Sequence, residues 1–461
     1  MENKSLKCIM NPKSVAIIGA SRNPEKVGRV IMQNYINTGY SGKLYPVNKE
    51  ADEILGRKAY KSVLDIKGRV DLAVIAIPAA GVPGVLEDCG KKGVRGAIVI
   101  SGGFSEVGNI ALQQQIVDIA KKYNMSLLGP NCLGVIDTRS RVNTMFLPTY
   151  KLAMPGIGSV SFVSQSGAVG STVLDVIAGE GFGLSKFISY GNAAYLDETD
   201  ILRYLLKDKD TKVIVLYVEG IKNPKGFIEV AKKITKVKPV IVLKAGRTQA
   251  GVSAAHSHTA ALAGNYAVQE AIFKQYGFTI AEDLDDLITY SKVFNLGTEP
   301  KGNRVAVITN GGGTGVLTAD AIASSGVLQL AEYTEETKNA LKEILPSFMN
   351  IASPLDLGGD ADAKRFGDAL SVIGKAQNID MIIVISLFQT PGADSTVAAE
   401  IIRQKTELDK PLVAISAGAA YTQMHKIMME SGGVPVYNSP ASAVKALAAL
   451  LRYSNYKKRR H

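Results

Sequence analysis

Two of the chain's four histidines, His256 and His258, lie in a long segment of small residues between Lys244 and Asn265. The segment follows an apolar, strand-like run and is rich in alanine, glycine and serine. Loops of this length are uncommon unless they serve a function. Because an imidazole can act as a nucleophile as well as a base, the segment is a candidate catalytic loop. A structural histidine and a His-x-His metal site are the alternatives, and the metal site lacks a third ligand in the sequence nearby.

A carboxylate stands at the carboxyl end of another apolar run, as Glu219 in Tyr217-Val-Glu-Gly-Ile221. A carboxylate in this position can fix the tautomer of a histidine and stabilise its charged form. Glu219 is therefore a second candidate catalytic residue.

Two glycine- and serine-containing turns follow strand-like runs, Ser164-Gln-Ser-Gly-Ala168 and Gly191-Asn192. A helix that begins after such a turn offers unpaired N–H groups and the positive end of its dipole to an anion. We expect these turns to bind a phosphoryl group. The alternative is an ordinary turn in which a serine caps the helix. The expected phosphate-binding residues are Ser164, Ser166, Gly167 and Gly191.

The first strand-like run ends in a glycine loop, Gly19 to Gly28, that resembles a dinucleotide-binding turn only in part. It lacks the second close glycine of Gly-x-Gly-x-x-Gly, and the next strand ends in Asn48 instead of the acid that binds a ribose. A nicotinamide cofactor is therefore not expected. The cations Arg22, Lys26 and Lys43 suit the phosphates of a ligand such as coenzyme A, with solvated surface as the alternative.

The chain is basic, with 53 Lys and Arg against 42 Asp and Glu among 461 residues. This excess suits anionic partners, namely nucleic acid, an anionic membrane or phosphorylated small molecules. The densest basic run is terminal, at Tyr456–His461, and is interpreted as a solubilising tail. No basic motif with interleaved aromatic residues occurs, so nucleic acid is not an expected partner. No Gly-x-x-x-x-Gly-Lys-Ser/Thr motif occurs either, so ATP would have to be held by another fold or another chain.

The hydropathy pattern and the cysteines indicate a cytoplasmic protein that does not enter a membrane. No apolar run approaches the ~20 residues of a membrane helix, and the first residues lack an apolar signal core. Cys8, Cys89 and Cys132 are odd in number and widely spaced, which fits neither a disulfide framework nor a zinc site.

Short apolar, β-branched runs alternate with helix-length segments along the chain, which predicts strands joined by crossover helices. Turn-rich segments at 148–158 and 297–302 divide the runs into three series. We predict an α/β protein of three doubly wound, Rossmann-like or flavodoxin-like parallel-sheet domains, at 1–150, 151–297 and 298–461. Ligands bind such sheets where strands end and helices begin, which is where the candidate residues stand. The expected strands are 14–19, 44–47, 72–77, 97–100, 126–128, 159–163, 187–189, 213–217, 240–243, 305–308, 381–385 and 412–415.

A series of motifs, in order along nearly the whole chain, resembles a known family, the alpha subunits of the ADP-forming acetyl-CoA synthetases. These enzymes are acyl-CoA synthetases related to succinyl-CoA synthetase. The motifs are Asn11-Pro-Lys-Ser-Val-Ala-Ile-Ile-Gly-Ala-Ser21, Gly129-Pro-Asn-Cys-Leu-Gly134, Val163-Ser-Gln-Ser-Gly167, Tyr217-Val-Glu-Gly-Ile221, Ser257-His-Thr259, Thr309-Asn-Gly-Gly-Gly313 and Ser353-Pro-Leu-Asp-Leu357.

The resemblance implies an acid–thiol ligase that converts acyl-CoA, phosphate and ADP into acid, CoA and ATP. The implied reaction proceeds through an acyl phosphate and a phosphohistidine. It is a substrate-level phosphorylation in acetate metabolism. The histidine of the family's Ser-His-Thr motif becomes phosphorylated, which selects His258 and leaves His256 without that role. Ser166 and Gly167 then cradle the phosphoryl group, and Glu219 pairs with the imidazole. Ala260 departs from the family's glycine after the motif.

The first domain is implied to bind CoA, and Cys132 to lie near the reacting centre without acting as a nucleophile. The third domain resembles the family's ligase-type domain, in which Gly311–Gly313 and Asp356 support contacts between domains or subunits. The implied CoA-binding residues are Gly19, Ser21, Arg22, Lys43, Pro46, Ile77, Pro78, Ser101, Asn131 and Cys132.

The resemblance also implies a partner, because no ATP-grasp sequence is present in this chain. A beta subunit with an ATP-grasp domain would hold ADP or ATP with Mg²⁺, in an α2β2 assembly. The competing interpretation is a CoA-binding regulatory module of a protein-acetylating enzyme that transfers no phosphoryl group. The presence of Glu219 and His258 favours the synthetase.

Overall fold

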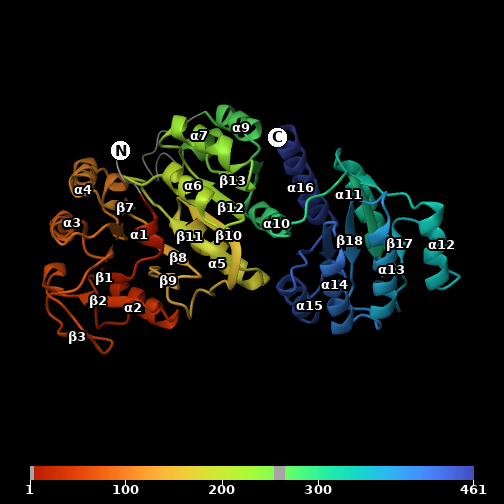
Figure 1. Ribbon diagram of the computed structural model, residues 1–461, viewed down its shortest axis with the longest axis horizontal. Coiled ribbons are helices and arrows are strands. Elements are labelled where there is room, and N and C mark those ends of the chain that lie inside the picture. Colours follow the sequence, from red (N-terminus) through yellow and green to blue (C-terminus); the bar gives the residue numbers. More distant parts are fainter. Residues whose placement is uncertain (1–4, 254–264, 461) are drawn as a thin grey trace. The chain divides into compact units, whose positions relative to one another are not determined.

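The computed structural model describes residues 5–253 and 265–460. His256, His258 and Ala260 lie outside the described residues. The chain forms two compact units (Figure 1). The first comprises Met1–Gly179 and Gly183–Leu284, and the second comprises Glu180–Phe182 and Asp285–His461.

The first unit begins with a five-stranded parallel sheet in the order β2-β1-β5-β6-β7. Its strands are β1 (Ser14–Ile18), β2 (Lys43–Val47), β5 (Leu72–Ile75), β6 (Gly96–Val99) and β7 (Ser126–Leu128). Its helices are α1 (Lys7–Met10), α2 (Val27–Asn37), α3 (Val82–Lys91) and α4 (Ile110–Lys122), and a hairpin of β3 (Glu53–Ile54) and β4 (Arg57–Lys58) is attached.

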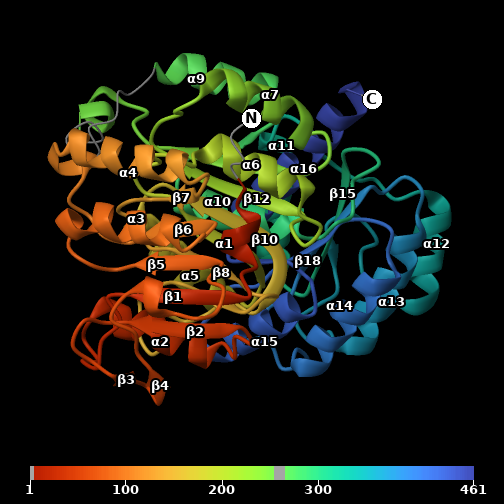
Figure 2. The ribbon, with the colours of Figure 1, turned by 60° about the vertical axis from the view of Figure 1, so that its left-hand side comes forward.

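Both faces of this sheet are buried, which explains why its strands are continuous apolar runs. Along β1, Val15 and Ile17 pack with α2 residues, while Ala16 and Ile18 belong to the core beneath α3 and α4. Helices α3 and α4 lie beside each other over that second face (Figure 2). The sheet is therefore doubly wound.

The second sheet of this unit has seven strands in the order β14-β13-β12-β10-β11-β8-β9. The strands are β8 (Val135–Asp137), β9 (Val142–Asn143), β10 (Ile157–Ser164), β11 (Leu184–Ser189), β12 (Val213–Val218), β13 (Val240–Lys244) and β14 (Thr279–Ile280). The helices are α5 (Gly167–Glu180), α6 (Glu198–Lys207), α7 (Pro224–Ile234) and α9 (Tyr266–Gln275). Strands β10 to β14 are parallel, and β8 and β9 extend the sheet in antiparallel pairing.

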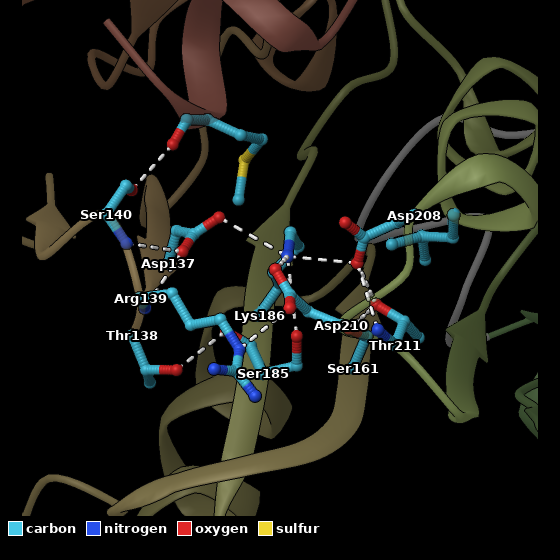
Figure 3. A network of polar contacts seen from close by, with 12 residues as sticks. Asp137, Thr138, Arg139, Ser140, Ser161, Ser185, Lys186, Asp208, Asp210 and Thr211 are labelled. Carbon is cyan, nitrogen blue, oxygen red and sulfur yellow. Dashed lines mark hydrogen bonds and ion pairs between the residues drawn. The ribbon is translucent and has the colours of Figure 1, made fainter.

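A buried ion cluster joins the antiparallel strand β8 to this sheet (Figure 3). Lys186 on β11 is 1% exposed, and its Nζ lies 2.9 Å from Asp208 and 3.4 Å from Asp137 on β8. An unpaired charge at this depth would be strongly destabilising, so the carboxylates are required wherever Lys186 is buried. The cluster thus fixes β8, which precedes the domain boundary expected at 150, within the second sheet.

The second unit contains a parallel sheet in the order β16-β15-β18-β19-β20, with β17 paired to β15. The strands are β15 (Arg304–Thr309), β16 (Gln329–Leu330), β17 (Leu355–Asp356), β18 (Met381–Ile385), β19 (Leu412–Ile415) and β20 (Val436–Tyr437). The helices are α10 (Leu284–Phe294), α11 (Gly312–Ser324), α12 (Glu335–Ile344), α13 (Ala363–Lys375), α14 (Ser395–Glu407), α15 (Ala420–Ser431) and α16 (Pro440–Arg460).

The expected fold class is confirmed, since the three larger sheets are wholly or mostly parallel and are joined by crossover helices. The expected strands all occur, most of them with ends that differ by one or two residues. No helix among residues 5–253 and 265–460 is both long enough and apolar enough to cross a membrane.

Candidate functional site

The strand order reverses at one place in each sheet of the first unit, between β1 and β5 and between β10 and β12. Open α/β sheets bind ligands outside the carboxyl ends of the strands at such a reversal. Both reversals open onto one cavity of about 960 Å³. The cavity walls include Gly19–Ser21 after β1, Ile77 and Pro78 after β5, Gln165–Ala168 after β10, and Glu219 after β12. The CoA-type and phosphate-type segments expected from the sequence therefore meet at one site.

The glycines of the first loop permit a close approach of backbone segments. Gly19 has φ +89°, and a Cβ there would lie 2.3 Å from the carbonyl oxygen of Ala76. A Cβ on Gly28, in the first turn of α2, would lie 2.1 Å from the carbonyl oxygen of Gly19. Only glycine allows α2 to begin so close to the strand that it follows. The start of α2 is thereby brought to the cavity wall.

Seven of the expected CoA-binding residues line the cavity, and three do not. Those in the wall are Gly19, Ser21, Ile77, Pro78, Ser101, Asn131 and Cys132. Lys43 is the first residue of β2 and pairs with Ser14, so it lies at the opposite edge of the sheet from Gly19. Pro46 is buried within β2, and the exposed Arg22 lies outside the lining residues. Lys26, the third of the expected cations, immediately precedes α2 and lines the cavity.

Asn131 and Gly191 connect the two halves of the cavity wall. The N–H of Asn131 donates to the carbonyl oxygen of Ser101 at 2.9 Å, and the N–H of Asn192 donates to that of Pro130 at 3.0 Å. Gly191 has φ +52°, and a Cβ there would lie 2.2 Å from the carbonyl oxygen of Asn131. Gly191 is required by this packing, and it also lines the cavity.

Cys132 is a neutral thiol in this wall. It is 4% exposed, and burial raises its pKa to about 12. The thiolate is the nucleophilic form of cysteine, so this pKa disfavours a nucleophilic role at neutral pH. The small, buried side chain is consistent with packing beside the reacting centre.

The turn before α5 both caps the helix and faces the cavity. The Ser166 hydroxyl accepts a hydrogen bond from the N–H of Val169 at 3.4 Å, as an N-cap side chain does. Ser166, Gly167 and Ala168 all line the cavity. Ser164 is fully buried and lies outside the lining residues, and its hydroxyl donates to the carbonyl oxygen of Ser166 at 2.7 Å. Ser164 thus supports the turn from beneath.

Glu219 is 6% exposed and lies in the same wall as this turn. Two further residues of the wall, Gln165 and Lys222, did not appear among the candidates from the sequence. Gln165 could have been found from its place inside the Ser164–Ala168 turn, whereas an exposed lysine such as Lys222 gives no signal in sequence. Lys222 and Lys26 supply positive charge suited to a phosphorylated ligand.

The third-domain candidates gather at the carboxyl edge of the third sheet. Thr309 at the end of β15 pairs with Asp356 in β17. A Cβ on Gly312 would lie 2.6 Å from Oδ2 of Asp356, and Gly311 immediately precedes α11. Gly311–Gly313 and Asp356 therefore belong to one corner of the second unit.

Comparisons with known protein families agree with this arrangement. Residues 13–138 match a CoA binding domain, residues 157–294 match a succinyl-CoA ligase like flavodoxin domain, and residues 305–458 match a Ligase-CoA domain. The first and third matches span the first and third sheets, whereas β8 and β9 of the second sheet precede the second match.

Relatives of known name cover nearly the whole chain. The alpha subunit of acetate–CoA ligase [ADP-forming] II from Pyrococcus furiosus is 41% identical over 448 residues, which is 96% of each chain. The acetate–CoA ligase [ADP-forming] of Methanocaldococcus jannaschii is 43% identical over 97% of this chain, and this chain spans 63% of the length of that relative.

A solved structure shares the fold along almost the entire length. The dinucleotide forming acetyl-coenzyme A synthetase 1 of Ca. Korarchaeum cryptofilum, in complex with phosphate and ADP, superposes with a TM-score of 0.92 at 36% identity, covering 99% of this chain and 98% of that one. With the sequence relatives and the three matching domains, this shows that the chain belongs to the family of ADP-forming acetate–CoA ligases, as a counterpart of their alpha subunit.

Proposed function

We propose that this chain is the alpha subunit of an ADP-forming acyl-CoA synthetase, with acetyl-CoA as its first candidate substrate. The observation that carries the proposal is the shared cavity. Its walls combine the loops of the CoA-binding domain with the start of α5 and Glu219. A thioester held by the first half would present its carbonyl carbon to phosphate held by the second half.

The first step joins phosphate to the acyl group. A phosphate oxygen attacks the thioester carbonyl carbon, the carbon–sulfur bond breaks, and CoA leaves as the thiolate, which takes up a proton. The product is an acyl phosphate. Lys26, Lys222 and the N-terminal turn of α5 place positive charge along this wall, which favours the developing negative charge.

The second step moves the phosphoryl group to the chain. An imidazole nitrogen of His258 attacks phosphorus, the bond between phosphorus and the acyl oxygen breaks, and the carboxylate leaves. Glu219 orients the imidazole and offsets its positive charge. Ser166 and Gly167 bind the phosphoryl oxygens, and Ser164 supports their turn.

The last step requires ADP, which we assign to a partner subunit of the ATP-grasp type that also holds Mg²⁺. The Pyrococcus furiosus relative is named as an alpha subunit, which supports a partner for this chain as well. The assembly proposed is α2β2.

The test measures CoA binding and phosphoryl transfer separately. Calorimetry of the purified chain should show binding of CoA and none of NAD. The complex with its partner should form ATP from acetyl-CoA, phosphate and ADP, and Glu219→Gln should lower that rate while CoA affinity is kept. A chain that binds CoA but transfers no phosphoryl group with any acyl-CoA would instead be a regulatory module.

A further inference from the structure

The loop after β12 contributes two charged side chains to the cavity wall, Glu219 and Lys222. Its backbone is bound by three side chains from three other parts of the chain. Gln165 Oε1 accepts from the N–H of Glu219 at 2.8 Å and from that of Gly220 at 3.2 Å. Lys244 Nζ donates to the carbonyl oxygen of Glu219 at 2.7 Å.

The third side chain is Glu198, the first residue of α6. Its Oε1 accepts from the N–H of Lys222 at 2.8 Å. The three side chains therefore engage four backbone atoms within four consecutive residues. We call Gln165, Lys244 and Glu198 the loop clamp.

The loop clamp is buried to a degree that is unusual for polar and charged groups. Gln165 is 7% exposed, Lys244 is 2% exposed and Glu198 is fully buried. Burying a charge opposes folding unless hydrogen bonds compensate it. Burial lowers the pKa of Lys244, although the nearby Glu219 acts in the opposite direction. Burying these groups costs stability, so a need to hold this loop in place explains their burial better than a contribution to general stability does.

Two members of the clamp lie next to segments that have a place in the proposed reaction. Gln165 lies directly before Ser166, so it connects the Glu219 loop to the phosphate-binding turn. Lys244 is the last residue of β13, from which the chain continues toward His256 and His258. Glu198 fixes the far end of the loop at the start of α6.

We propose that Gln165, Lys244 and Glu198 are positioning residues, which hold the backbone of residues 219–222 so that Glu219 and Lys222 are placed for phosphoryl transfer. The inference rests on the proposed function and adds residues to it. Catalysis by fixed charges requires placement within a fraction of an ångström, and a 1 Å displacement can cost about 100-fold in rate. The clamp acts through the loop backbone.

The test uses Lys244→Met and Gln165→Met, which remove the donor and the acceptor while keeping side-chain length. Gln165→Glu is the conservative variant, because a carboxylate oxygen can still accept from both N–H groups. The matched control is Lys238→Met, since Lys238 Nζ donates to the carbonyl oxygens of Leu205 and Asp208 at 2.5 Å and lies outside the cavity lining. Gln404→Met, in the second unit, is the control for a buried glutamine.

Two measurements are compared across these variants. Hydrogen exchange in a peptide containing residues 219–222 should be faster in Lys244→Met and Gln165→Met, and unchanged in the controls. In the assembled complex, kcat should fall about 10- to 100-fold in the two clamp variants, with little change in the KM for acetyl-CoA. Gln165→Glu should retain most of the protection.

Three results would overturn the inference. These are unchanged exchange at residues 219–222 in both clamp variants, faster exchange with kcat within twofold of wild type, and an equal loss of kcat in Lys238→Met. A wild-type complex without ATP synthesis would count against the proposed function instead. The exchange measurement would still show whether the clamp holds the loop.

Discussion

His256 and His258 differ by two positions in one segment, and imidazole chemistry alone does not rank them. The proposed reaction needs one nucleophile, and Glu219 can orient one ring at a time. We expect His258→Ala to abolish the acid-labile phosphoprotein and ATP synthesis. His256→Ala should retain phosphorylation and most of the activity, because this substitution changes only a neighbour of the nucleophile. Mass spectrometry of the phosphorylated chain shows which histidine carries the phosphoryl group. A phosphoryl group on His256 would contradict the assignment of His258 as the nucleophile.

Glu198 makes the stability of the chain dependent on pH. Burial, and then the neighbouring Asp197, raise its pKa to about 7 from 4.5, against the opposing effects of hydrogen bonds and Lys222. A carboxyl group whose pKa is raised by folding stabilises the fold below its unfolded pKa, and that stability is lost as the pH rises to the folded pKa. Wild type should therefore lose stability between about pH 4.5 and 7.

Glu198→Gln removes this titration and keeps an oxygen acceptor for the N–H of Lys222. Its free energy of unfolding, relative to wild type, should rise across that pH range by up to about 3 kcal/mol and stay constant above it. Denaturant unfolding at a series of pH values measures the difference. Glu229→Gln, at an exposed position on α7, is the control and should show little change. A difference for Glu198→Gln that is flat with pH would contradict the prediction.

At the scale of elements, the start of α2 depends on Gly28. A Cβ there would lie 2.1 Å from the carbonyl oxygen of Gly19, which neither backbone segment can accommodate in place. Gly28→Ala should therefore move α2 away from the first loop and weaken CoA binding about tenfold or more. The control is Gly84→Ala in α3, because a Cβ at Gly84 meets no atom within 4 Å. That variant should bind CoA normally and gain up to about 1 kcal/mol of stability.

The sequence predicted those strands whose burial on both faces is visible as an uninterrupted apolar run. The runs at 381–385 and 412–415 match β18 and β19 residue for residue, because a strand buried on both faces is an uninterrupted apolar run. Two-residue strands such as β9 and β14 contain no run of this kind and were missed. Strand β8 joins the second sheet through Lys186 and Asp137, a contact that no local pattern reveals.

The residues that line the cavity could be predicted from the sequence only in part. Glycine and serine turns after strands identified part of the cavity wall, because strand ends in parallel sheets converge at one edge. The family resemblance, and not these turns, suggested Ile77, Pro78, Ser101, Asn131 and Cys132. Lys43 has a charge suited to a phosphate, yet it begins its strand and so lies at the other edge of the sheet. Gln165 and Glu198 act on backbone N–H groups, and such contacts depend on folding that local sequence does not display.

For the whole molecule, the distribution of sites predicts a division of labour between subunits. The cavity of the first unit contains the proposed sites for CoA and phosphate, and His258 belongs to the same chain. The chain carries neither a Walker-type phosphate loop nor an ATP-grasp sequence. The isolated chain should therefore accept phosphate on histidine from acetyl-CoA plus labelled phosphate, and release CoA, without forming ATP from added ADP.

Adding the partner subunit should restore ATP formation and discharge the label. Synthesis of ATP by the isolated chain at the rate of the complex would show that the partner holds no required site, and an isolated chain that takes up no label would place part of the phosphate site on the partner.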